Sequence, residues 1–297
     1  MSLILKGENL TKNYPAFNLK DINLEINQGE ITGVVGENGN GKTTLLRILA
    51  GELSLDAGQL QYNFGNNDWY KLKQDIAYIP QRIPRWYGFL KDNLYFKNSI
   101  RGLTGKENID YTDELIEKLG LTEFTNHKWT EISTGYRLRF QLAKVLLGRP
   151  KLIILDEPLA NLDINAEQKL LGDLKMLAKE ENVGIIFSSQ QLHEVEKVAD
   201  NLIFLSKGKA LYSGKRKEFS TERNENIFEL YGGCELVELE TLLQNEAINT
   251  IQDTGGAFTL TASTNMTSIK LMQLLVTHNI ELEYFRNIST STRKLFS

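Results

Sequence analysis

Glycines, a lysine and threonines at residues 36–44 follow the spacing G-x-x-x-x-G-K-[ST], which is typical of phosphate-binding loops. Glycines let the backbone curl so that successive N–H groups point at phosphate, and a following helix N-terminus adds a favourable dipole. Lys42 would reach the β- and γ-phosphates, and Thr43 would place its hydroxyl on Mg²⁺. The segment therefore predicts binding of a nucleoside triphosphate. Its residues are Gly36, Glu37, Asn38, Gly39, Asn40, Gly41, Lys42, Thr43 and Thr44.

Two carboxylates form the second group with chemical potential. Asp156 and Glu157 directly follow the apolar run Leu152–Leu155, which reads as a buried strand. Asp156 would hold Mg²⁺, directly or through water, and Glu157 is placed to take a proton from an attacking water. The alternative is a pair of solvated carboxylates at a strand end. With the phosphate loop upstream, we expect these two carboxylates to support hydrolysis of a nucleoside triphosphate.

The elements that position these residues follow from hydrophobic periodicity. An apolar strand at 31–35 precedes the loop and a helix at 45–50 follows it. Strands that alternate with helices in the rest of this region imply a central parallel sheet. The other predicted elements are antiparallel strands over 3–30, a strand pair between 57 and 79, helices at 111–119 and 136–147, a strand at 151–155, a helix at 165–179, a strand at 184–187, a helix at 192–199 and a strand at 202–205.

The character of the chain changes after Gly214. Residues 220–226 are polar and resemble a linker. The pattern that follows is strand, helix, two strands, helix and strand, which predicts a small ferredoxin-like module. The expected fragments are 227–231, 235–243, 247–252, 257–262, 268–277 and 281–285.

Composition narrows the class of protein. The net charge of −4 and the pI near 5.6 argue against broad attraction to nucleic acid or acidic lipid. A single cysteine, Cys234, excludes an internal disulfide framework and fits a reducing cytosol. We find neither a run of about 20 apolar residues that a membrane helix needs nor the apolar segment of a signal peptide. A role at a membrane would therefore require another polypeptide.

Over residues 3–219 the chain resembles the nucleotide-binding subunit of ATP-binding cassette (ABC) transporters. The resemblance implies an α/β P-loop NTPase core in domain 1–219, with a parallel sheet, an antiparallel β subdomain and a helical subdomain at about 84–150. A small α+β ferredoxin-like domain would occupy 220–297, as a regulatory or dimerising module or as a passive cap. Tyr14 stands where the family places an aromatic that stacks on adenine, although a half-buried strand tyrosine is the plainer interpretation. Gln81 matches the glutamine that senses Mg²⁺ and the γ-phosphate.

The family's signature turn is only partly kept. Ser133 and Gly135 match it, whereas Thr134 and Tyr136 replace a glycine and a glutamine. The resemblance implies that this turn binds the γ-phosphate of ATP held by the opposite subunit. A threonine disfavours positive φ, so the turn could differ, and a serine-capped helix explains the same residues. Asp163 matches the aspartate of the loop that crosses the dimer interface.

The largest departure from the family lies after residue 188. Gln190 stands where the resemblance expects a switch histidine. A neutral amide can donate a hydrogen bond to a γ-phosphate but cannot shuttle a proton. We therefore predict intact ATP binding and slower hydrolysis than in histidine-bearing relatives. His193 is more simply interpreted as a solvated helix residue.

The resemblance implies a transporter ATPase that uses ATP and Mg. It would dimerise with itself or with another ATPase subunit, and it would energise transmembrane permease subunits from the cytoplasmic face of the membrane. Residues 82–89, with Ile83, Trp86 and Tyr87, are the expected docking surface, unless they pack on the helical region. Two alternatives remain: a regulatory subunit that binds ATP with weak or no hydrolysis, and a soluble ABC ATPase acting on nucleic acid. No nucleic-acid partner is expected from the acidic balance.

Overall fold

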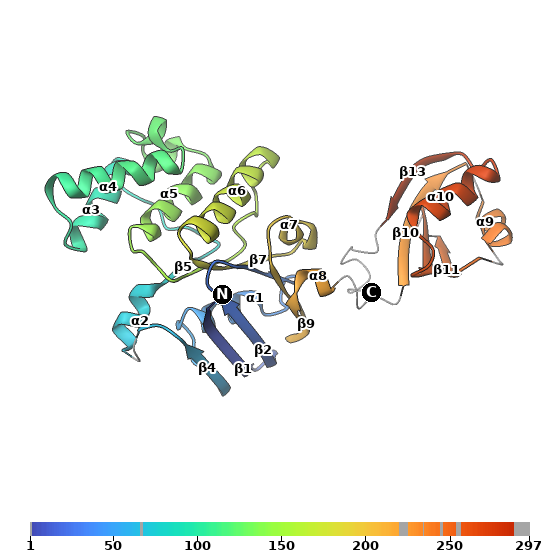
Figure 1. The fold of residues 1–297 in the computed structure, drawn as a ribbon, viewed down its shortest axis with the longest axis horizontal. Coiled ribbons are helices and arrows are strands. Elements are labelled where there is room, and N and C mark those ends of the chain that lie inside the picture. The colour runs from blue at the N-terminus through green and yellow to red at the C-terminus, as the bar shows by residue number, and fades with distance from the viewer. Residues whose placement is uncertain are drawn as a thin grey trace. The chain divides into compact units, whose positions relative to one another are not determined.

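The computed structural model describes residues 2–65, 68–219, 225–233, 235–243, 246–253 and 257–287. The chain divides into two compact units, Met1–Arg216 and Lys217–Ser297, close to the expected boundary (Figure 1). Residues 220–224 of the predicted linker 220–226 lie outside the described residues, as does Cys234. Its last two residues, Glu225 and Asn226, instead begin strand β10 (Glu225–Gly232).

A six-stranded sheet forms the centre of the first unit. Neighbouring strands are parallel except for the last pair, β8 and β9. The inner strands β6, β7 and β3 are buried at every position, because helices or a second sheet cover both faces. Across the sheet the order is β5 (Ile76–Ile79), β6 (Leu152–Leu155), β7 (Gly184–Ser189), β3 (Ile31–Val35), β8 (Asn201–Ser206) and β9 (Lys209–Lys215).

A three-stranded antiparallel sheet covers one side. Its order is β2 (Phe17–Asn27), β1 (Leu3–Tyr14) and β4 (Ala57–Tyr62). The apolar residues of β1 and β2 pack with α1 (Lys42–Leu49) and with the central sheet in one hydrophobic core. In Figure 1, α5 (Thr134–Leu146) and α6 (Ile164–Glu180) lie on the other side of the central sheet.

The prediction of a strand pair between 57 and 79 is wrong. β4 joins the antiparallel sheet, whereas β5 pairs with β6 in the central sheet. A short helix, α2 (Trp69–Asp75), separates them, and the Asp68 carboxylate caps it by accepting the Tyr70 N–H at 2.9 Å. The two strands follow each other in the sequence, but each finds its partner in a different sheet.

Residues 86–147 form the helical region. The helices are α3 (Leu90–Ile100), α4 (Gly105–Lys118), η2 (Thr122–Phe124), η3 (Trp129–Glu131) and α5. Trp86 is buried, with its ring stacked on Trp129 at 5.1 Å and the Lys144 ammonium 5.0 Å from its centre. Of the expected docking residues, Trp86 therefore packs on the helical region, whereas Tyr87 is 80% exposed.

The remaining elements of the first unit are α6, α7 (Leu192–Glu196) and the strands β8 and β9. A short helix, α8 (Arg216–Phe219), follows at the division between the two units. The helix predicted at 192–199 ends three residues early, at Glu196.

The second unit has the predicted element order. Its elements are β10 (Glu225–Gly232), α9 (Leu236–Leu243), β11 (Ile248–Asp253), β12 (Phe258–Ser263), α10 (Ser268–Thr277) and β13 (Leu282–Asn287). The sheet order is β11-β12-β10-β13, with every neighbouring pair antiparallel. Phe228, Leu260 and Leu271 belong to its core. The ferredoxin-like classification of this unit stays a prediction.

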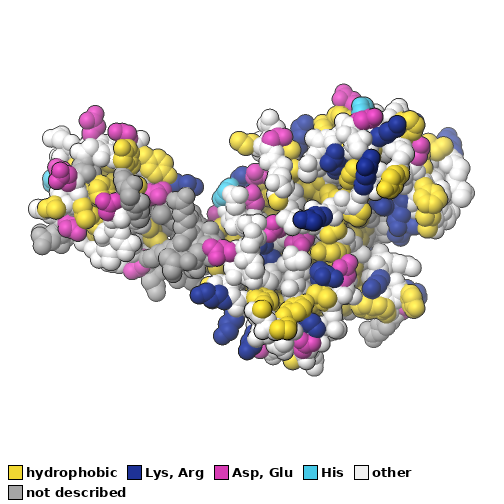
Figure 2. Space-filling view, turned by 180° about the vertical axis from the view of Figure 1, so that it is seen from behind, with side chains coloured by type: hydrophobic (Ala, Val, Ile, Leu, Met, Phe, Trp, Pro, Cys, Tyr) yellow, Lys and Arg dark blue, Asp and Glu magenta, His cyan; other side chains and the backbone are white. Residues whose placement is uncertain are grey.

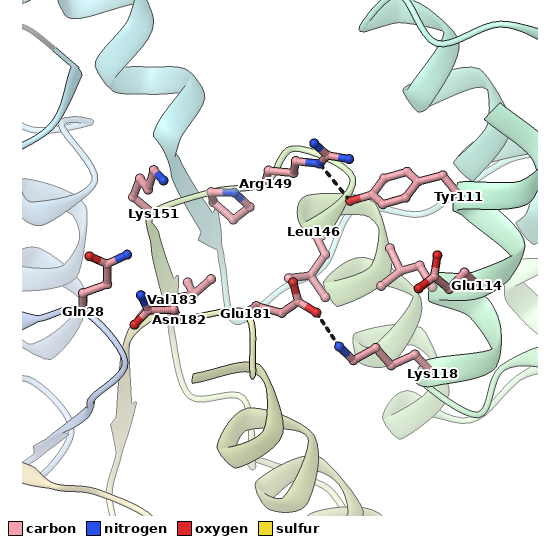
Figure 3. Close-up of a pocket in the computed structure, with 12 residues that line it drawn as sticks. Gln28, Tyr111, Glu114, Lys118, Leu146, Arg149, Lys151, Glu181, Asn182 and Val183 are labelled. Carbon is pink, nitrogen blue, oxygen red and sulfur yellow. Dashed lines mark hydrogen bonds and ion pairs between the residues drawn. The ribbon is translucent and has the colours of Figure 1, made fainter. Parts of the chain in front are cut away.

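Acidic and basic side chains are interspersed on the face of the molecule drawn in Figure 2. On the first unit, a pocket of about 340 Å³ lies between α4 and the start of β6, and Figure 3 shows it. Arg149 stacks on Tyr111 there, and Lys118 pairs with Glu181. The pocket contains none of the predicted nucleotide-binding residues.

Candidate functional site

The phosphate loop connects β3 to α1, as predicted. Gly39 and Gly41 adopt positive φ angles of 83° and 97°, which residues with a Cβ rarely tolerate. A Cβ on Gly41 would also lie 2.7 Å from Cζ of Phe17. Glycine at this position therefore permits both the turn into α1 and the close approach of Phe17.

Lys42 lies across the loop. Its side chain is only 4% exposed, and its Nζ donates to the carbonyl oxygens of Gly36 at 2.7 Å and Glu37 at 3.2 Å. The same Nζ forms an ion pair with Oε1 of Glu157 at 3.1 Å. The structure thus brings the lysine of the loop into contact with the second predicted carboxylate.

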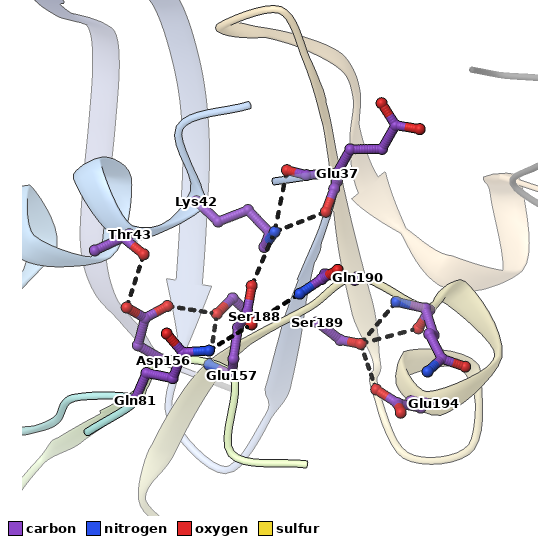
Figure 4. Close-up of polar contacts among 12 residues, drawn as sticks. Glu37, Lys42, Thr43, Gln81, Asp156, Glu157, Ser188, Ser189, Gln190 and Glu194 are labelled. Atoms are coloured by element: carbon purple, nitrogen blue, oxygen red, sulfur yellow. Dashed lines mark hydrogen bonds and ion pairs between the residues drawn. The ribbon is translucent and has the colours of Figure 1, made fainter. Parts of the chain in front are cut away.

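Both oxygens of the Asp156 carboxylate are hydrogen-bonded, as Figure 4 shows. Thr43 Oγ1 donates to Oδ2 at 2.8 Å, and Ser188 Oγ donates to Oδ1 at 2.8 Å. Asp156 is 4% exposed, at the end of β6. The two residues that were each predicted to hold Mg²⁺ are therefore in direct contact.

Glu157 occupies an unusual backbone conformation, with φ at +47°. Residues other than glycine rarely adopt this left-handed backbone conformation, and those that do are often found at functional sites. Two amides donate to its Oε2, Gln81 Nε2 at 2.9 Å and Gln190 Nε2 at 3.0 Å. Three residues from distant segments, Lys42, Gln81 and Gln190, therefore meet at one carboxylate (Figure 4).

Local hydrogen bonds of Ser189 hold the segment that contains Gln190. Ser189 Oγ accepts the Gln191 N–H at 2.8 Å and hydrogen-bonds the Glu194 carboxyl. Burial raises the pKa of Glu194, which is 8% exposed. His193 is exposed, as expected.

We call the set Gly36–Thr44, Gln81, Asp156, Glu157 and Gln190 the phosphate-loop half.

The donors in this half suit a hard cation. Thr43 offers a hydroxyl oxygen, Asp156 a carboxylate and Gln81 an amide oxygen, and Mg²⁺ prefers oxygen ligands. The hydroxyl and carboxylate already lie 2.8 Å apart at the edge of the loop. These residues therefore fit a Mg²⁺ ion that is shared with phosphate.

Ser133, Gly135 and Asp163 meet in a separate place, which we call the signature-turn half. Ser133 is the N-cap of α5, and its side chain accepts the Tyr136 N–H at 3.4 Å. Asp163 is the N-cap of α6, and its side chain accepts the Ala166 N–H at 2.9 Å. Together with neighbouring residues they line a pocket of about 260 Å³, which contains no residue of the phosphate-loop half.

The replacements in the signature turn are accommodated without strain. Thr134 is the first residue of α5, and no residue from Ile132 to Tyr136 has a positive φ. Thr134 therefore occupies this turn without the positive φ that a threonine disfavours. The Tyr136 ring instead packs on Phe124, with centroids 3.9 Å apart.

Tyr14 ends β1 and is 38% exposed. It pairs across the β1–β2 hairpin with Phe17, whose ring lies against Gly41.

Asn40 is buried within the loop, and its Oδ1 accepts the Lys207 N–H at 3.0 Å. The remaining loop residues Glu37, Asn38 and Gly39 are exposed.

Two residues of the site were not anticipated. Phe17 packs against the loop, and Ser188 bridges the Asp156 carboxylate and the backbone N–H of Glu157. The position of Ser188 near the carboxyl end of a parallel strand was the available signal, because such strand ends meet at one edge of a sheet.

Comparison with known proteins gives a consistent family. A family model described as ABC transporter matches residues 19–160. The uncharacterized ABC transporter ATP-binding protein YhaQ of Bacillus subtilis (strain 168) is 31% identical over 220 residues, covering 72% of this chain and 72% of that protein. The bacitracin transport ATP-binding protein BcrA of Bacillus licheniformis is 35% identical over 216 residues, covering 71% of this chain and 69% of that protein.

A solved structure agrees. The cbiO1 protein from Clostridium perfringens, described as part of the ABC transporter complex cbiONQ, superimposes with a TM-score of 0.69 at 28% identity. The match covers 75% of this chain and 92% of that one.

The fold and the phosphate-loop half define a P-loop nucleotide-binding protein. The chain belongs to the ABC transporter family, in which it is an ATP-binding subunit. It is an ATPase that energises transport, and subunits of this kind dimerise and work with membrane permease components. Within the part of the chain described by the structure, no helix is long and apolar enough to span a bilayer.

Proposed function

We propose that this chain binds Mg-ATP in the phosphate-loop half and hydrolyses it with Glu157 as general base. The observation that carries the proposal is the meeting of Lys42, Thr43, Asp156 and Glu157 beside the amide-rich loop. The triphosphate would lie along the loop N–H groups, with Lys42 on its β- and γ-phosphates. Tyr14 would stack on the adenine.

Bound Mg²⁺ would neutralise phosphate charge. Thr43 and Asp156 would hold the ion, with Gln81 beside them. The protein's own part is to fix these oxygen atoms before the nucleotide arrives, which the hydrogen bonds to Asp156 support.

The Lys42–Glu157 ion pair gives ATP binding a direct consequence for the base. Phosphate oxygens attract Lys42 strongly, so the bound nucleotide would compete with Oε1 of Glu157 for the same ammonium group. Gln81 and Gln190 would keep Oε2 in place, because both donate to that oxygen. Oε1 would then be free to accept a proton from water.

A second ATP-binding subunit would supply the other half of each site. Its Ser133–Gly135 turn would bind the γ-phosphate through the N-terminus of α5, and its Asp163 would lie at the interface. Either a homodimer or a heterodimer satisfies this arrangement. Closure of the pair would move the docking surface and drive the membrane subunit.

Tyr87 and Phe89 are the best candidates for that docking surface, because they are 80% and 44% exposed beside Gln81 in sequence. Exposed aromatic residues are enriched in protein interfaces. We infer a cytoplasmic protein attached to the inner face of the membrane through the permease.

The Glu157→Gln variant tests the proposal. It should keep ATP affinity, lose hydrolysis by roughly 10²- to 10⁴-fold and accumulate a closed dimer with trapped ATP. Phosphate release, nucleotide binding and size-exclusion chromatography with ATP measure the three outcomes. Glu180→Gln, an exposed residue of α6, is the control and should behave as wild type. Normal hydrolysis by Glu157→Gln would refute the base assignment.

A further inference from the structure

One hydroxyl group joins the carboxylate of Asp156 to the backbone of Glu157. Ser188 Oγ donates to Oδ1 of Asp156 at 2.8 Å and accepts the backbone N–H of Glu157, also at 2.8 Å. The residue is fully buried, with 0% exposure. A serine hydroxyl has one hydrogen to donate and two lone pairs to accept, so it can make both contacts at once.

The sheet order explains why this residue has access to both acids. Strand β7 lies between β6, which ends before Asp156, and β3, which leads into the phosphate loop. Leu155 pairs with Phe187, so the next residues on each strand, Asp156 and Ser188, are adjacent at the carboxyl edge. Figure 4 shows the Ser188 side chain beside Asp156 and Glu157.

The two contacts act on different features of the site. On Asp156, Ser188 fixes one carboxylate oxygen while Thr43 fixes the other, which sets the plane of the carboxylate. On Glu157, the contact anchors the backbone of a residue held at a φ of +47°. That conformation persists only where its surroundings impose it.

The neighbouring residues show that this contact is specific to Ser188. Ser189 is also buried, but its hydroxyl contacts Gln191 and Glu194 instead. Thr32 on β3 is 1% exposed, and its hydroxyl has no hydrogen-bond partner among the described residues. A buried hydroxyl in this sheet therefore does not by default reach the carboxylates.

We propose that Ser188 is a positioning residue that orients Asp156 toward the metal and Glu157 toward the attacking water. This inference rests on the roles proposed above for those two acids. Residues that hydrogen-bond to a metal ligand without touching the metal orient that ligand. Their substitution typically lowers metal affinity or activity by about 10- to 100-fold. Ser188 has the geometry of such a group for both acids at once.

A matched pair of variants isolates the hydroxyl. Ser188→Thr and Ser188→Val add side chains of nearly equal shape, and only the first keeps the hydroxyl. Compared with Ser188→Thr, Ser188→Val should lower kcat by about 10-fold or more at saturating Mg-ATP. Thr32→Val, which removes a buried hydroxyl without partners, should match wild type.

A second readout does not depend on turnover. The affinity for a non-hydrolysable ATP analogue is measured with Mg²⁺ and with EDTA, and the ratio gives the gain due to the metal. The gain should be about 10-fold smaller in Ser188→Val than in Ser188→Thr. Should both bulkier variants misfold, Ser188→Ala against wild type gives the same comparison without added volume.

Equal kcat and equal metal-dependent gain in the two variants would overturn the proposal. So would an equal loss of affinity with and without Mg²⁺, because a general structural defect explains that result. Glu157→Gln in the same assays separates a failure of the proposed function from a failure of the role proposed for Ser188. If it hydrolyses ATP normally, the proposed base is wrong. If it is inactive while the Ser188 pair is indistinguishable, only the role of Ser188 fails.

Discussion

The phosphate-loop half and the signature-turn half differ in how completely they are formed. In the first, Lys42, Asp156 and Glu157 are each held by two or more polar contacts within the chain. In the second, the Ser133 and Asp163 side chains cap their own helices, and the pocket between them is open. The first half is organised by contacts within the chain, and the second presents two helix N-termini to its pocket.

This difference indicates where affinity and turnover reside. A preorganised, buried polar site can bind a phosphate without further ordering. The pocket of the signature-turn half contains no loop residue, so under the proposed function this half would contribute to hydrolysis only when another subunit brings a nucleotide to it. Arg139 and Asp173 hold its two helices together through a double hydrogen bond at 2.7 and 3.2 Å.

The sharpest test alters one residue in each half. Lys42→Ala should lower the ATP affinity of the isolated chain by roughly 100-fold or more, because a buried charged contact is removed. Gly135→Ala should leave that affinity unchanged and lower hydrolysis by about 10-fold, since the added methyl would lie 3.0 Å from Ala166 Cβ and shift the turn. Fluorescent-nucleotide binding and phosphate release measure the two effects.

Gly172→Ala is the matched control for the second substitution. It adds the same methyl to α6, where, apart from the adjacent residues and the helix's own backbone, no atom of the described residues would lie within 4 Å of the new methyl. Weaker ATP binding by Gly135→Ala in the isolated chain would contradict the separation of the two halves.

The two halves also differ in how far the sequence could predict them. The phosphate loop and the Asp156–Glu157 pair are local patterns, so the residues themselves specify the glycine turns and the strand end. The contacts of Lys42 with Glu157 and of Ser188 with Asp156 join segments more than 30 residues apart. They depend on strand order, which hydrophobic periodicity does not contain.

Errors in the fold have the same origin. Consecutive apolar segments favour a hairpin, so the sequence predicts β4 and β5 as partners, whereas each pairs in a different sheet and α2 lies between them. Trp86 and Tyr87 are adjacent and both aromatic, yet one is 5% exposed and the other 80% exposed. Only the packing against Trp129 and Phe140 distinguishes them.

Buried polar contacts also occur at the opposite end of β3 from the phosphate loop. Glu30 is 2% exposed, and burial alone would raise its pKa. Hydrogen bonds from Asn201, Asn27 and Lys215 outweigh that effect and lower the pKa to about 2. Because the folded-state pKa lies below the ordinary value of 4.5, the stabilisation is complete above that pH and is lost as the pH falls toward 2.

Glu30→Gln should therefore lower the free energy of unfolding by about 2 to 3 kcal/mol at pH 7, with a difference from wild type that shrinks below pH 4.5. Urea denaturation at pH 7, 5, 4 and 3 measures it. Glu52→Gln, in an exposed pair with Arg47, should cost less than about 1 kcal/mol at every pH. A constant penalty for Glu30→Gln across this range would show that shape, not charge, explains its contribution.

The smallest expected effect concerns Gln190, at the position where the resemblance predicts a switch histidine. Gln190 donates one hydrogen bond to Glu157, and a histidine could donate the same bond while also carrying a proton near neutral pH. Gln190→His should therefore raise kcat by about 3- to 10-fold, the equivalent of roughly 1 kcal/mol, with the gain largest below pH 7. Phosphate release between pH 6 and 8 measures it, and Gln191→His, one residue further on at the start of α7, is the control. No gain in Gln190→His would mean that the amide already suffices, and that turnover is limited by the signature-turn half rather than by the phosphate-loop half.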